Sequence, residues 1–330
     1  MRVLITGISG FAGSFLAEHC LDKSGVEVVG LVRDLSRLGH AAPLEARCTF
    51  FRGDVRDGAA VDAAIQEGQP DVVFNLAGQA SVAQAFSDPS GTLMDNAVGQ
   101  LNVIQSVLKE RPQARLLVVG SAYEYGLVRP EENPIDENVP LRPMDPYAVS
   151  KVAQDLFGYQ YSLSHRLQAV RVRAFNHTGP RQSDDFVASR FARQIAEIEA
   201  GTKEPVLTVG NLTAVRDFTD VRDVVQAYFL AATKGQPGEV YNVGSGQGHR
   251  IEEILALLIG LSSVKVRVEE DQALLRPLDV PALLCDAGKL RQHTGWEPHI
   301  PLERTLSDLL DYWRQRVKNR PEEPKAVPAA

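Results

Sequence analysis

Cysteine is scarce in this sequence, and its few residues lie far apart. Of 330 residues only Cys20, Cys48 and Cys285 are cysteines, and no Cys-x-x-Cys spacing occurs. Zinc ribbons need paired cysteines and disulfide frameworks need an even, dense set, so neither kind of site is indicated. The scattered, odd number is typical of a reducing compartment, and we expect a cytoplasmic protein.

Long apolar runs and an excess of basic residues are also missing. No apolar stretch is long enough to span a bilayer, and the chain opens on a strand-like run, so we expect neither a membrane span nor a signal peptide. The net charge is −7, whereas a nucleic-acid binder would carry a basic stripe, so we expect no nucleic-acid partner. With 44% hydrophobic and 23% charged residues, the composition is that of an ordinary globular protein.

Apolar, β-branched runs alternate with helical segments through the first half of the chain. Such alternation requires crossover connections, which give an α/β fold with a doubly wound parallel sheet of Rossmann type. Beyond residue 180, long helices separate shorter apolar runs, which predicts a smaller second domain. The predicted strands are 3–6, 26–32, 49–52, 72–76, 116–120, 170–173, 206–209, 239–243 and 264–268, and the first helices are 11–21, 58–67 and 92–109.

A glycine-rich turn, Gly7-Ile8-Ser9-Gly10-Phe11-Ala12-Gly13, follows the first predicted strand and opens a helix. Glycines let the backbone turn sharply and approach a pyrophosphate, whose charge is favoured at a helix N-terminus. The turn therefore predicts a dinucleotide site, with Gly7, Gly10, Phe11, Ala12 and Gly13 as its contacts.

The ends of the second and third predicted strands bear on which dinucleotide is bound. An arginine at the tip of the second strand suits a ribose 2′-phosphate and an acid suits a 2′-hydroxyl, so Arg33 favours NADP(H) while Asp34 leaves NAD(H) open. Asp54 and Val55, after the third strand, are candidates for the adenine contact. Spacing alone leaves Asp54 equally open to a role as a helix-capping acid.

Three residues suggest acid–base chemistry. Tyr147 and Lys151 stand four residues apart, on one face of a predicted helix that Pro146 begins. A fixed ammonium favours the phenolate, so we expect the pKa of Tyr147 to fall from about 10 toward neutrality. Ser121 ends a predicted buried strand, at the sheet edge where ligands bind, and its hydroxyl is placed to hold a carbonyl that Tyr147 protonates.

Together with Leu76-Ala77-Gly78 and Asn96-x-x-Gly99, these motifs resemble the extended short-chain dehydrogenase/reductase family, in order from residue 1 to about 315. The resemblance implies a bound NADP(H) or NAD(H), with Leu76, Ala77 and Gly78 beside it and Lys151 on the nicotinamide ribose. It also implies a homodimer formed by packing of the helix that carries Tyr147. We expect an NAD(P)-binding Rossmann domain over residues 1–175, and a disordered tail over 316–330. Between them, residues 176–315 are expected to form mainly a substrate domain, with some segments returning to the first domain.

The second half resembles the members of this family that act on nucleotide-linked sugars. Residues 173–180 resemble their substrate loop, and residues 210–218 resemble a segment of GDP-mannose 4,6-dehydratases and their reductase relatives, where an arginine holds a phosphate. The spacing leaves open which of Arg181, Arg190 and Arg193 meets the substrate. The substrate candidates are Ser81, Tyr123, Asn176, Arg193, Asn211, Arg216 and Arg276.

One position bears on the type of reaction. The dehydratases of the group carry a glutamate two residues after the Ser/Thr, as the extra base for elimination; here that position is Tyr123. Glu124 is adjacent, but in extended backbone it would point to the opposite face. We therefore expect reduction of a GDP-linked keto-sugar. A dehydratase, an epimerase that keeps NAD bound, and a non-catalytic NADP sensor are the alternatives.

Overall fold

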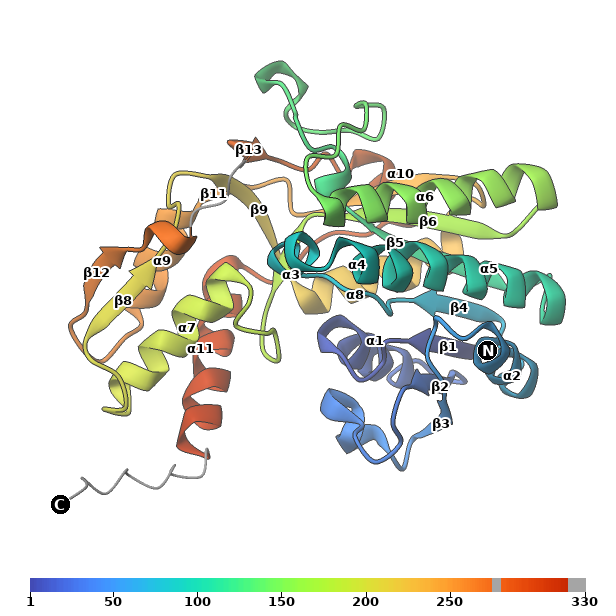
Figure 1. Ribbon diagram of the computed structural model, residues 1–330, viewed down its shortest axis with the longest axis horizontal. Helices are drawn as coiled ribbons and strands as arrows, with labels where there is room; N and C mark the ends of the chain where they lie inside the picture. Colours follow the sequence, from blue (N-terminus) through green and yellow to red (C-terminus); the bar gives the residue numbers. More distant parts are fainter. Residues whose placement is uncertain (275–279, 320–330) are drawn as a thin grey trace.

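A seven-stranded sheet dominates the computed structural model, which describes residues 1–274 and 280–319 (Figure 1). Its strands are all parallel and lie in the order β10-β6-β5-β4-β1-β2-β3. This is the doubly wound α/β fold that the alternation of segments predicted. The strands are β1 (Arg2–Thr6), β2 (Glu27–Val32), β3 (Cys48–Arg52), β4 (Val72–Asn75), β5 (Arg115–Ser121), β6 (Ala169–Ala174) and β10 (Val240–Val243).

Helices cover both faces of this sheet, so its strands are apolar on both sides. In β1, Val3 and Ile5 are buried in one core and Leu4 in the other, because successive side chains of a strand point to opposite faces. Helices α1 (Phe11–Leu21) and α8 (Val221–Lys234) pack on the first face, with α10 (Gly288–Thr294) beside α8. Helices α2 (Gly58–Gly68), α5 (Gly99–Glu110) and α6 (Pro146–His165) pack on the second.

A second, smaller core lies beside the carboxyl ends of the large sheet (Figure 1). It packs α7 (Val187–Glu199), α9 (Ile251–Gly260) and α11 (Leu302–Lys318) together, with Phe191, Ile195, Leu306 and Leu310 fully or almost fully buried. Two small sheets complete it: β11 (Gly248–Arg250), β9 (Val215–Asp220) and β13 (Ala282–Leu283), joined by β7 (Asn176–Thr178), and β12 (Arg267–Glu270) with β8 (Val206–Val209). The structure also has short helices at Gly39–Leu44, Ala122–Glu124 (η3), Pro130–Glu132 and Gln272–Leu274.

Two expectations need correction. The helix predicted over 92–109 is α4 (Pro89–Leu93), a π-helical turn at Met94–Val98 and α5, preceded by α3 (Val82–Ser87). The wide turn brings Asn96 toward the loop after β4, where it hydrogen-bonds Gln79. Asn96 also hydrogen-bonds Ser150 on α6. The predicted tail begins too early, because residues 316–318 are the last turn of α11, whose Leu309, Leu310 and Trp313 are buried. Residues 320–330 lie outside the described part.

The chain passes between the two cores more than once. After the first pass through the second core, the chain returns to the large sheet as β10, which pairs with β6. The boundary at residue 175 therefore stays a prediction about folding units.

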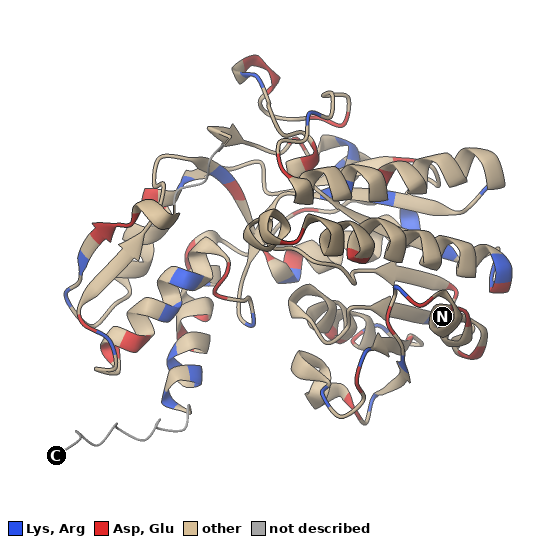
Figure 2. Ribbon diagram, viewed as in Figure 1, with Lys and Arg blue, Asp and Glu red and all other residues tan. Residues whose placement is uncertain are grey.

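Acidic and basic residues are interspersed along the ribbon (Figure 2). Within residues 1–274 and 280–319, no helix is long and apolar enough to cross a membrane.

Candidate active site

The glycine-rich turn between β1 and α1 packs so closely on neighbouring backbone that it has no space for side chains. Gly7 has a φ of +69°, and a Cβ there would lie 2.8 Å from the Ala77 amide nitrogen. A Cβ at Gly13 would lie 2.8 Å from the Gly7 carbonyl carbon. Gly10 is the N-cap of α1 and offers no side chain to the N–H groups of Phe11 and Ala12 that follow. These residues fit a dinucleotide pyrophosphate, because the cradle excludes side chains and ends at a helix N-terminus.

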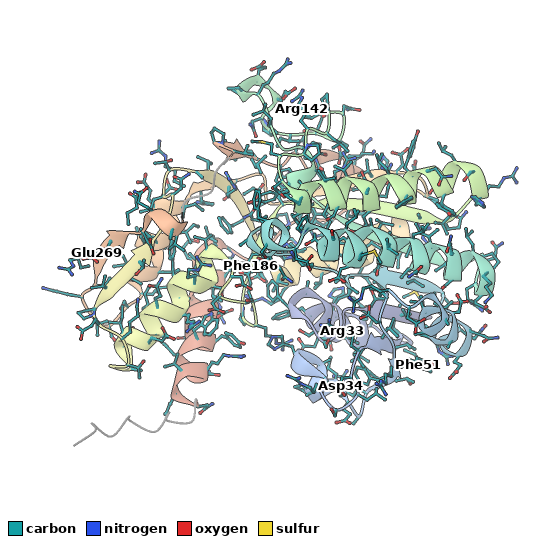
Figure 3. All side chains as sticks on the ribbon, viewed as in Figure 1. Arg33, Asp34, Phe51, Arg142, Phe186 and Glu269 are labelled. Carbon is teal, nitrogen blue, oxygen red and sulfur yellow. The ribbon has the colours of Figure 1, made fainter. Side chains whose placement is uncertain are left out.

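The residues expected at the adenosine end lie together at the tips of β2 and β3. Arg33 and Asp34 are exposed beside each other (Figure 3). The Asp34 carboxylate accepts hydrogen bonds from the Ser36 amide (2.9 Å) and hydroxyl (2.7 Å), which lower its pKa. The Asp54 carboxylate is held by the Arg56 guanidinium (3.0 and 2.7 Å), which lowers its pKa too. Because both carboxylates are engaged, the exposed guanidinium of Arg33 is available to an anionic ligand, and the exposed Arg37 and Arg52 lie nearby.

Asp54 does not cap the next helix, which was the alternative left open for it. Asp57 caps α2 instead, accepting a hydrogen bond from the Ala59 amide at 3.0 Å. Val55 is buried and packs against Gly99, where a Cβ would lie 2.9 Å from its Cγ2. The expected adenine contact of Asp54 and Val55 therefore stays a prediction, but the capping role is excluded by the geometry.

The loop after β4 approaches the glycine turn closely. The Ala77 amide donates to Thr6 Oγ1 (3.0 Å), which joins this loop to the end of β1. A Cβ on Gly78 would collide with Asn96 Oδ1, an atom that already accepts a hydrogen bond from the Gln79 amide at 2.8 Å. Leu76 and Ala77 thus lie against Gly7 of the glycine turn, and the cofactor contacts expected of Leu76, Ala77 and Gly78 stay a prediction.

Ser121, Tyr147 and Lys151 converge, as their spacing predicted. Ser121 ends β5, and Tyr147 lies in the first turn of α6, which begins at Pro146 and is capped by Asp145 through the Ala148 amide (2.8 Å). The Ser121 hydroxyl lies near enough to the Tyr147 hydroxyl to oppose the rise in the pKa of that phenol. The Lys151 ammonium lies 6.0 Å from the centre of the Tyr147 ring. The site therefore brings together a proton donor (Tyr147), a hydroxyl (Ser121) and a cation (Lys151) at the carboxyl edge of a parallel sheet.

The pKa of Tyr147 departs from the expectation. Burial raises the pKa of this phenol above its usual value of 10, and the field of Glu124 adds to that effect, while the nearby Ser121 hydroxyl opposes it. Burial also lowers the pKa of Lys151 to about 8. Desolvation outweighs the attraction between phenolate and ammonium, because both groups are removed from water. Tyr147 is accordingly held as a phenol, the form that can donate a proton.

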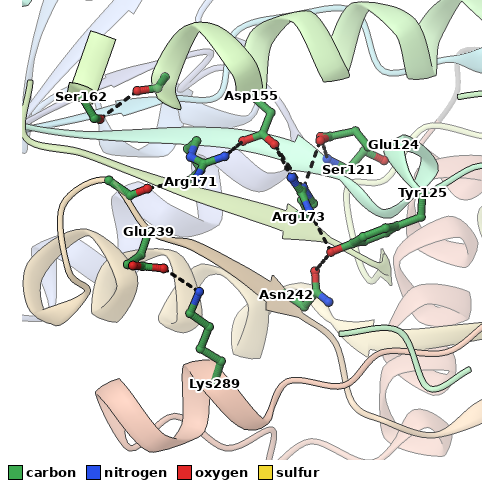
Figure 4. Close-up of polar contacts among 12 residues, drawn as sticks. Ser121, Glu124, Tyr125, Asp155, Ser162, Arg171, Arg173, Glu239, Asn242 and Lys289 are labelled. Carbon is green, nitrogen blue, oxygen red and sulfur yellow. Dashed lines mark hydrogen bonds and ion pairs between the residues drawn. The ribbon is translucent and has the colours of Figure 1, made fainter. Parts of the chain in front are cut away.

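Glu124 lies in a buried ionic cluster and not in extended backbone, so the reason given for its orientation was wrong. Residues Ala122–Glu124 form a short helical turn, and Glu124 Oε1 accepts a hydrogen bond from the Ser121 amide at 2.7 Å. Its Oε2 pairs with Arg173 at 3.2 Å, beside Asp155, which accepts from the same guanidinium (Figure 4). Both oxygens of Glu124 are engaged and the side chain is fully buried, so it is unsuited to removing a substrate proton.

The cluster was missed from the sequence, although a signal was present. Arg171 and Arg173 interrupt an otherwise apolar strand, and buried arginines require acidic partners. Asp155, one turn beyond Lys151 on α6, accepts from Arg171 at 2.9 Å and from Arg173 at 2.5 Å. Tyr125 completes the cluster: its hydroxyl accepts from Arg173 at 3.1 Å and donates to Asn242 at 2.7 Å. The cluster ties α6 to the sheet behind the three converging residues.

The expected substrate residues are spread over several elements. Tyr123 packs edge-on against Tyr147, with ring centres 6.2 Å apart. Ser81 caps α3 by accepting from the Gln84 amide at 3.3 Å. Asn176, half-buried, begins β7 next to β9, which carries the buried Arg216. Of these four, Tyr123 is the residue that the structure brings directly against the converging residues.

The remaining substrate candidates have partners within the chain or lie outside the described residues. Asn211 Oδ1 accepts from the Thr213 amide (3.0 Å). Arg193 pairs with Glu197 at 2.8 Å and also with Asp184. Arg276 falls in 275–279, outside the described part.

The other two competing arginines, Arg181 and Arg190, also have partners within the chain. Arg181 reaches α1, donating to Ser14 (3.1 Å) and pairing with Glu18 (2.7 Å). It thereby joins the loop after β7 to the helix that opens the glycine cradle. Arg190 donates to the Asp184 carbonyl at 3.1 Å. Arg181 and Arg190 are both engaged by the chain itself, and the ranking of the three for substrate remains a prediction.

The comparison with known proteins agrees with the family resemblance that the sequence motifs indicated. The family model described as GDP-mannose 4,6 dehydratase matches residues 4–309. The chain belongs to this family. GDP-6-deoxy-D-mannose reductase of Pseudomonas aeruginosa is 37% identical, over 76% of this chain and 82% of that protein. The family match confirms the expected membership of the extended short-chain dehydrogenases/reductases.

Solved structures agree on the fold. The RMD protein of Pseudomonas aeruginosa complexed with NADPH superposes with a TM-score of 0.84 at 32% identity, covering 96% of this chain and 99% of that one. The UDP-glucose 4-epimerase of Thermus thermophilus in complex with NAD gives 0.84 at 30% identity, covering 95% and 99%. Solved structures with this fold thus include a protein complexed with NADPH and an epimerase complexed with NAD, so the fold alone does not determine the reaction.

Proposed function

We propose that this protein reduces the 4-keto group of GDP-4-keto-6-deoxy-D-mannose with NADPH, giving GDP-D-rhamnose. The observation that carries the proposal is the placement of the second and third residues after Ser121. Tyr123 stands at the position where the dehydratases carry a glutamate, and the neighbouring Glu124 is buried against Arg173. A dehydratase must remove a proton and expel a hydroxyl in addition to its redox step. A reductase needs only a hydride and a proton donor.

The protonation state of the site supports the same direction. NADPH, when bound in the glycine cradle, supplies the hydride to C4 of the sugar. Tyr147 then gives its phenolic proton to the carbonyl oxygen, which becomes the C4 hydroxyl, and the phenolate recovers a proton from solvent. A raised pKa keeps Tyr147 in the donor form at neutral pH. Ser121 positions the carbonyl oxygen, and the Lys151 ammonium stabilises the phenolate while it exists.

NADPH is preferred in this proposal because of Arg33. Its guanidinium is exposed at the tip of β2, whereas the Asp34 carboxylate next to it is bound by Ser36. A guanidinium binds the 2′-phosphate of NADPH with paired donors, while the free 2′-hydroxyl of NADH offers it no charge. The relative of known structure complexed with NADPH agrees with this preference. NADH remains the weaker alternative.

The GDP moiety is assigned to the second core. Arg216 is buried on β9, adjacent to β7 and its half-buried Asn176. Arg216 stands on the central strand of this small sheet, between β11 and β13, and a buried guanidinium can bind a diphosphate with paired donors. We assign Arg216 and Asn176 to the diphosphate region, and Ser81 and Tyr123 to the sugar side, where Tyr123 packs against Tyr147.

A homodimer is part of the proposal. One face of α6 exposes Val149, Leu156, Tyr159 and Leu163, each with 44 to 68% of its surface accessible. Apolar side chains spaced in this way along a helix are typical of a helix–helix interface. Sedimentation of the wild-type protein should give a dimer, and Leu156→Glu should give a monomer. A wild-type monomer would contradict the assignment.

The test of the reaction is an assay with two sugars. The purified protein is incubated with GDP-4-keto-6-deoxy-D-mannose and NADPH, and separately with GDP-mannose and NADP⁺. In the first mixture we expect oxidation of NADPH, and we expect this oxidation to be lost in Tyr147→Phe. In the second mixture we expect no conversion of GDP-mannose. Conversion of GDP-mannose to the keto-sugar, with no oxidation of NADPH by the keto-sugar, would replace the proposal with a dehydratase.

A further inference from the structure

A continuous line of buried side-chain hydrogen bonds joins the glycine cradle to Lys151. It starts at the Ala77 amide, which donates to Thr6 Oγ1 at 3.0 Å. Thr6 in turn donates to Asn75 Oδ1 at 2.5 Å. The Asn75 amide group then donates across to Gln100 Oε1 at 2.8 Å. This half of the line connects β1 and β4 with α5, and the three side chains are no more than 1% exposed.

The other half starts at the catalytic lysine. The Lys151 ammonium donates to the Gln154 side-chain oxygen at 2.8 Å and to the Val119 carbonyl at 3.0 Å. Gln154 Nε2 donates to Gln100 Oε1 at 3.0 Å. Gln154 is 1% exposed and lies one turn beyond Lys151 on α6. Both halves therefore end on one atom, the side-chain oxygen of Gln100.

The direction of every bond in this line is dictated by its two ends. A backbone amide can only donate, and so can an ammonium group. Starting from Ala77, donation passes through Thr6 and Asn75; starting from Lys151, it passes through Gln154. Gln100 Oε1 must accept from both sides, and Gln100 Nε2 is left buried without a partner among the described residues. An unsatisfied buried amide is costly, so its retention points to a role for the line beyond packing.

Reversal of the Gln154 amide is excluded by this arrangement. A reversed amide would place its NH₂ group against the ammonium and its oxygen against Gln100 Oε1, so that it loses both bonds. The titratable groups whose fields reach Lys151 are Glu124 on η3 and Tyr147 on its own helix. Gln154 is the one uncharged side chain seen to hold the ammonium, among the hydrogen bonds of residues 1–274 and 280–319.

We propose that Gln154 is a positioning residue for Lys151: oriented by Gln100, it holds the ammonium beside Tyr147 and stabilises its charged form. The inference rests on the proposed function for its kinetic consequence, because Lys151 matters to turnover only if Tyr147 is the proton donor. Its structural part concerns the lysine alone and is measurable without substrate or cofactor.

Two substitutions at this position should move the Lys151 titration in opposite directions. Gln154→Leu removes the acceptor, so the ammonium loses stabilisation and titrates at lower pH. Gln154→Glu keeps an oxygen in the same place and adds a negative charge, so the ammonium titrates at higher pH. A side chain that serves only to fill space would not produce shifts of opposite sign.

The experiment is a pH titration of the cofactor-free protein, labelled with carbon-13 at lysine Cε and followed by NMR. Lys151→Met assigns the resonance. We expect it to titrate near pH 8 in the wild type, about one pH unit lower in Gln154→Leu and about one unit higher in Gln154→Glu. Gln160→Glu, at an exposed position of the same helix, is the matched control and should leave the titration unchanged.

Opposite shifts in the two variants support the proposal. An unchanged titration in either variant, or shifts of the same sign, would overturn it. The kinetic arm tests the consequence separately: the alkaline limb of the reductase pH profile should follow the lysine titration in each variant. If the wild type turns over no keto-sugar, the proposed function fails, while the NMR result still decides the role of Gln154.

Discussion

Glu124 holds the backbone of Ser121 where β5 ends, through its side-chain carboxylate. The Ser121 amide donates to Glu124 Oε1 at 2.7 Å, and Ser121 Oγ accepts from the Tyr123 amide at 3.2 Å. Because the Ser121 oxygen accepts a backbone N–H, its own proton remains available for donation. The capping arrangement thus presents Ser121 as a donor toward a carbonyl oxygen. Glu124, which is in the wrong place to act as an elimination base, fixes that arrangement.

Substitutions of Glu124 should act through Ser121. Glu124→Gln retains the acceptor for the Ser121 amide, and we expect kcat within about threefold of the wild type. Glu124→Leu removes the acceptor, and we expect kcat to fall roughly tenfold or more, equivalent to about 1.4 kcal/mol. In a Ser121→Ala background the leucine variant should have no further effect. An equal loss in both backgrounds, measured as a double-mutant cycle on kcat, would show that Glu124 acts elsewhere.

The buried cluster around Asp155 should matter more for stability than an accessible ion pair. Asp155→Ala leaves Arg171 and Arg173 without their shared carboxylate, and the unfolding free energy should fall by about 3–5 kcal/mol. Glu132→Ala, which breaks the more accessible pair with Arg142, is the control and should lower the unfolding free energy much less, because solvent screens this pair. Denaturant unfolding measures both. Similar losses in the two variants would refute this assignment.

Burial of Lys151 should make stability depend on pH. Its folded pKa is lowered to about 8 from an ordinary 10.5. Between those values the unfolded chain binds more protons, so stability rises with pH, and the full cost is present below pH 8. Lys151→Met removes this cost, which is roughly 3 kcal/mol. We expect the variant to gain stability relative to the wild type at pH 7 and to lose most of that advantage by pH 10, as measured by urea unfolding. A stability difference that is the same at both pH values would contradict the burial effect.

The cofactor preference should reside in Arg33. Arg33→Ala removes the guanidinium at the tip of β2, and we expect the Kd for NADPH to rise roughly tenfold or more while that for NADH changes little. Fluorescence titration of the two reduced cofactors measures this. If both constants rise together, Arg33 serves the binding of dinucleotides in general and the preference lies in other residues.

Much of the fold and the core of the site follow from local sequence signals. The glycine turn, the strand that ends in Ser121 and the Tyr147–Lys151 pair are each defined by neighbours within a few residues, so their placement could be predicted. Glu124 had a local signal as well, because Ser121-x-x-Glu124 is a capping-box pattern. We expected extended backbone there, so the hydrogen bond of this carboxylate to the Ser121 amide was not predicted.

Other features depend on contacts between distant segments. Gln100 and Gln154 are 54 residues apart, and no spacing rule connects them. The raised pKa of Tyr147 results from burial by the assembled chain, which the helical spacing to Lys151 does not report. The break of the predicted helix over 92–109 likewise serves a tertiary contact, between Asn96 and the loop after β4. Such features require the three-dimensional arrangement.

The direction of the redox step is the central claim, and transfer of a deuterium label tests it most directly. NADPH deuterated at its transferable position is incubated with the protein and GDP-4-keto-6-deoxy-D-mannose, and the product is examined by NMR. The account predicts GDP-D-rhamnose with one deuterium at C4, and no labelled product from Tyr147→Phe. Recovery of the keto-sugar without label, together with its formation from GDP-mannose, would contradict the account.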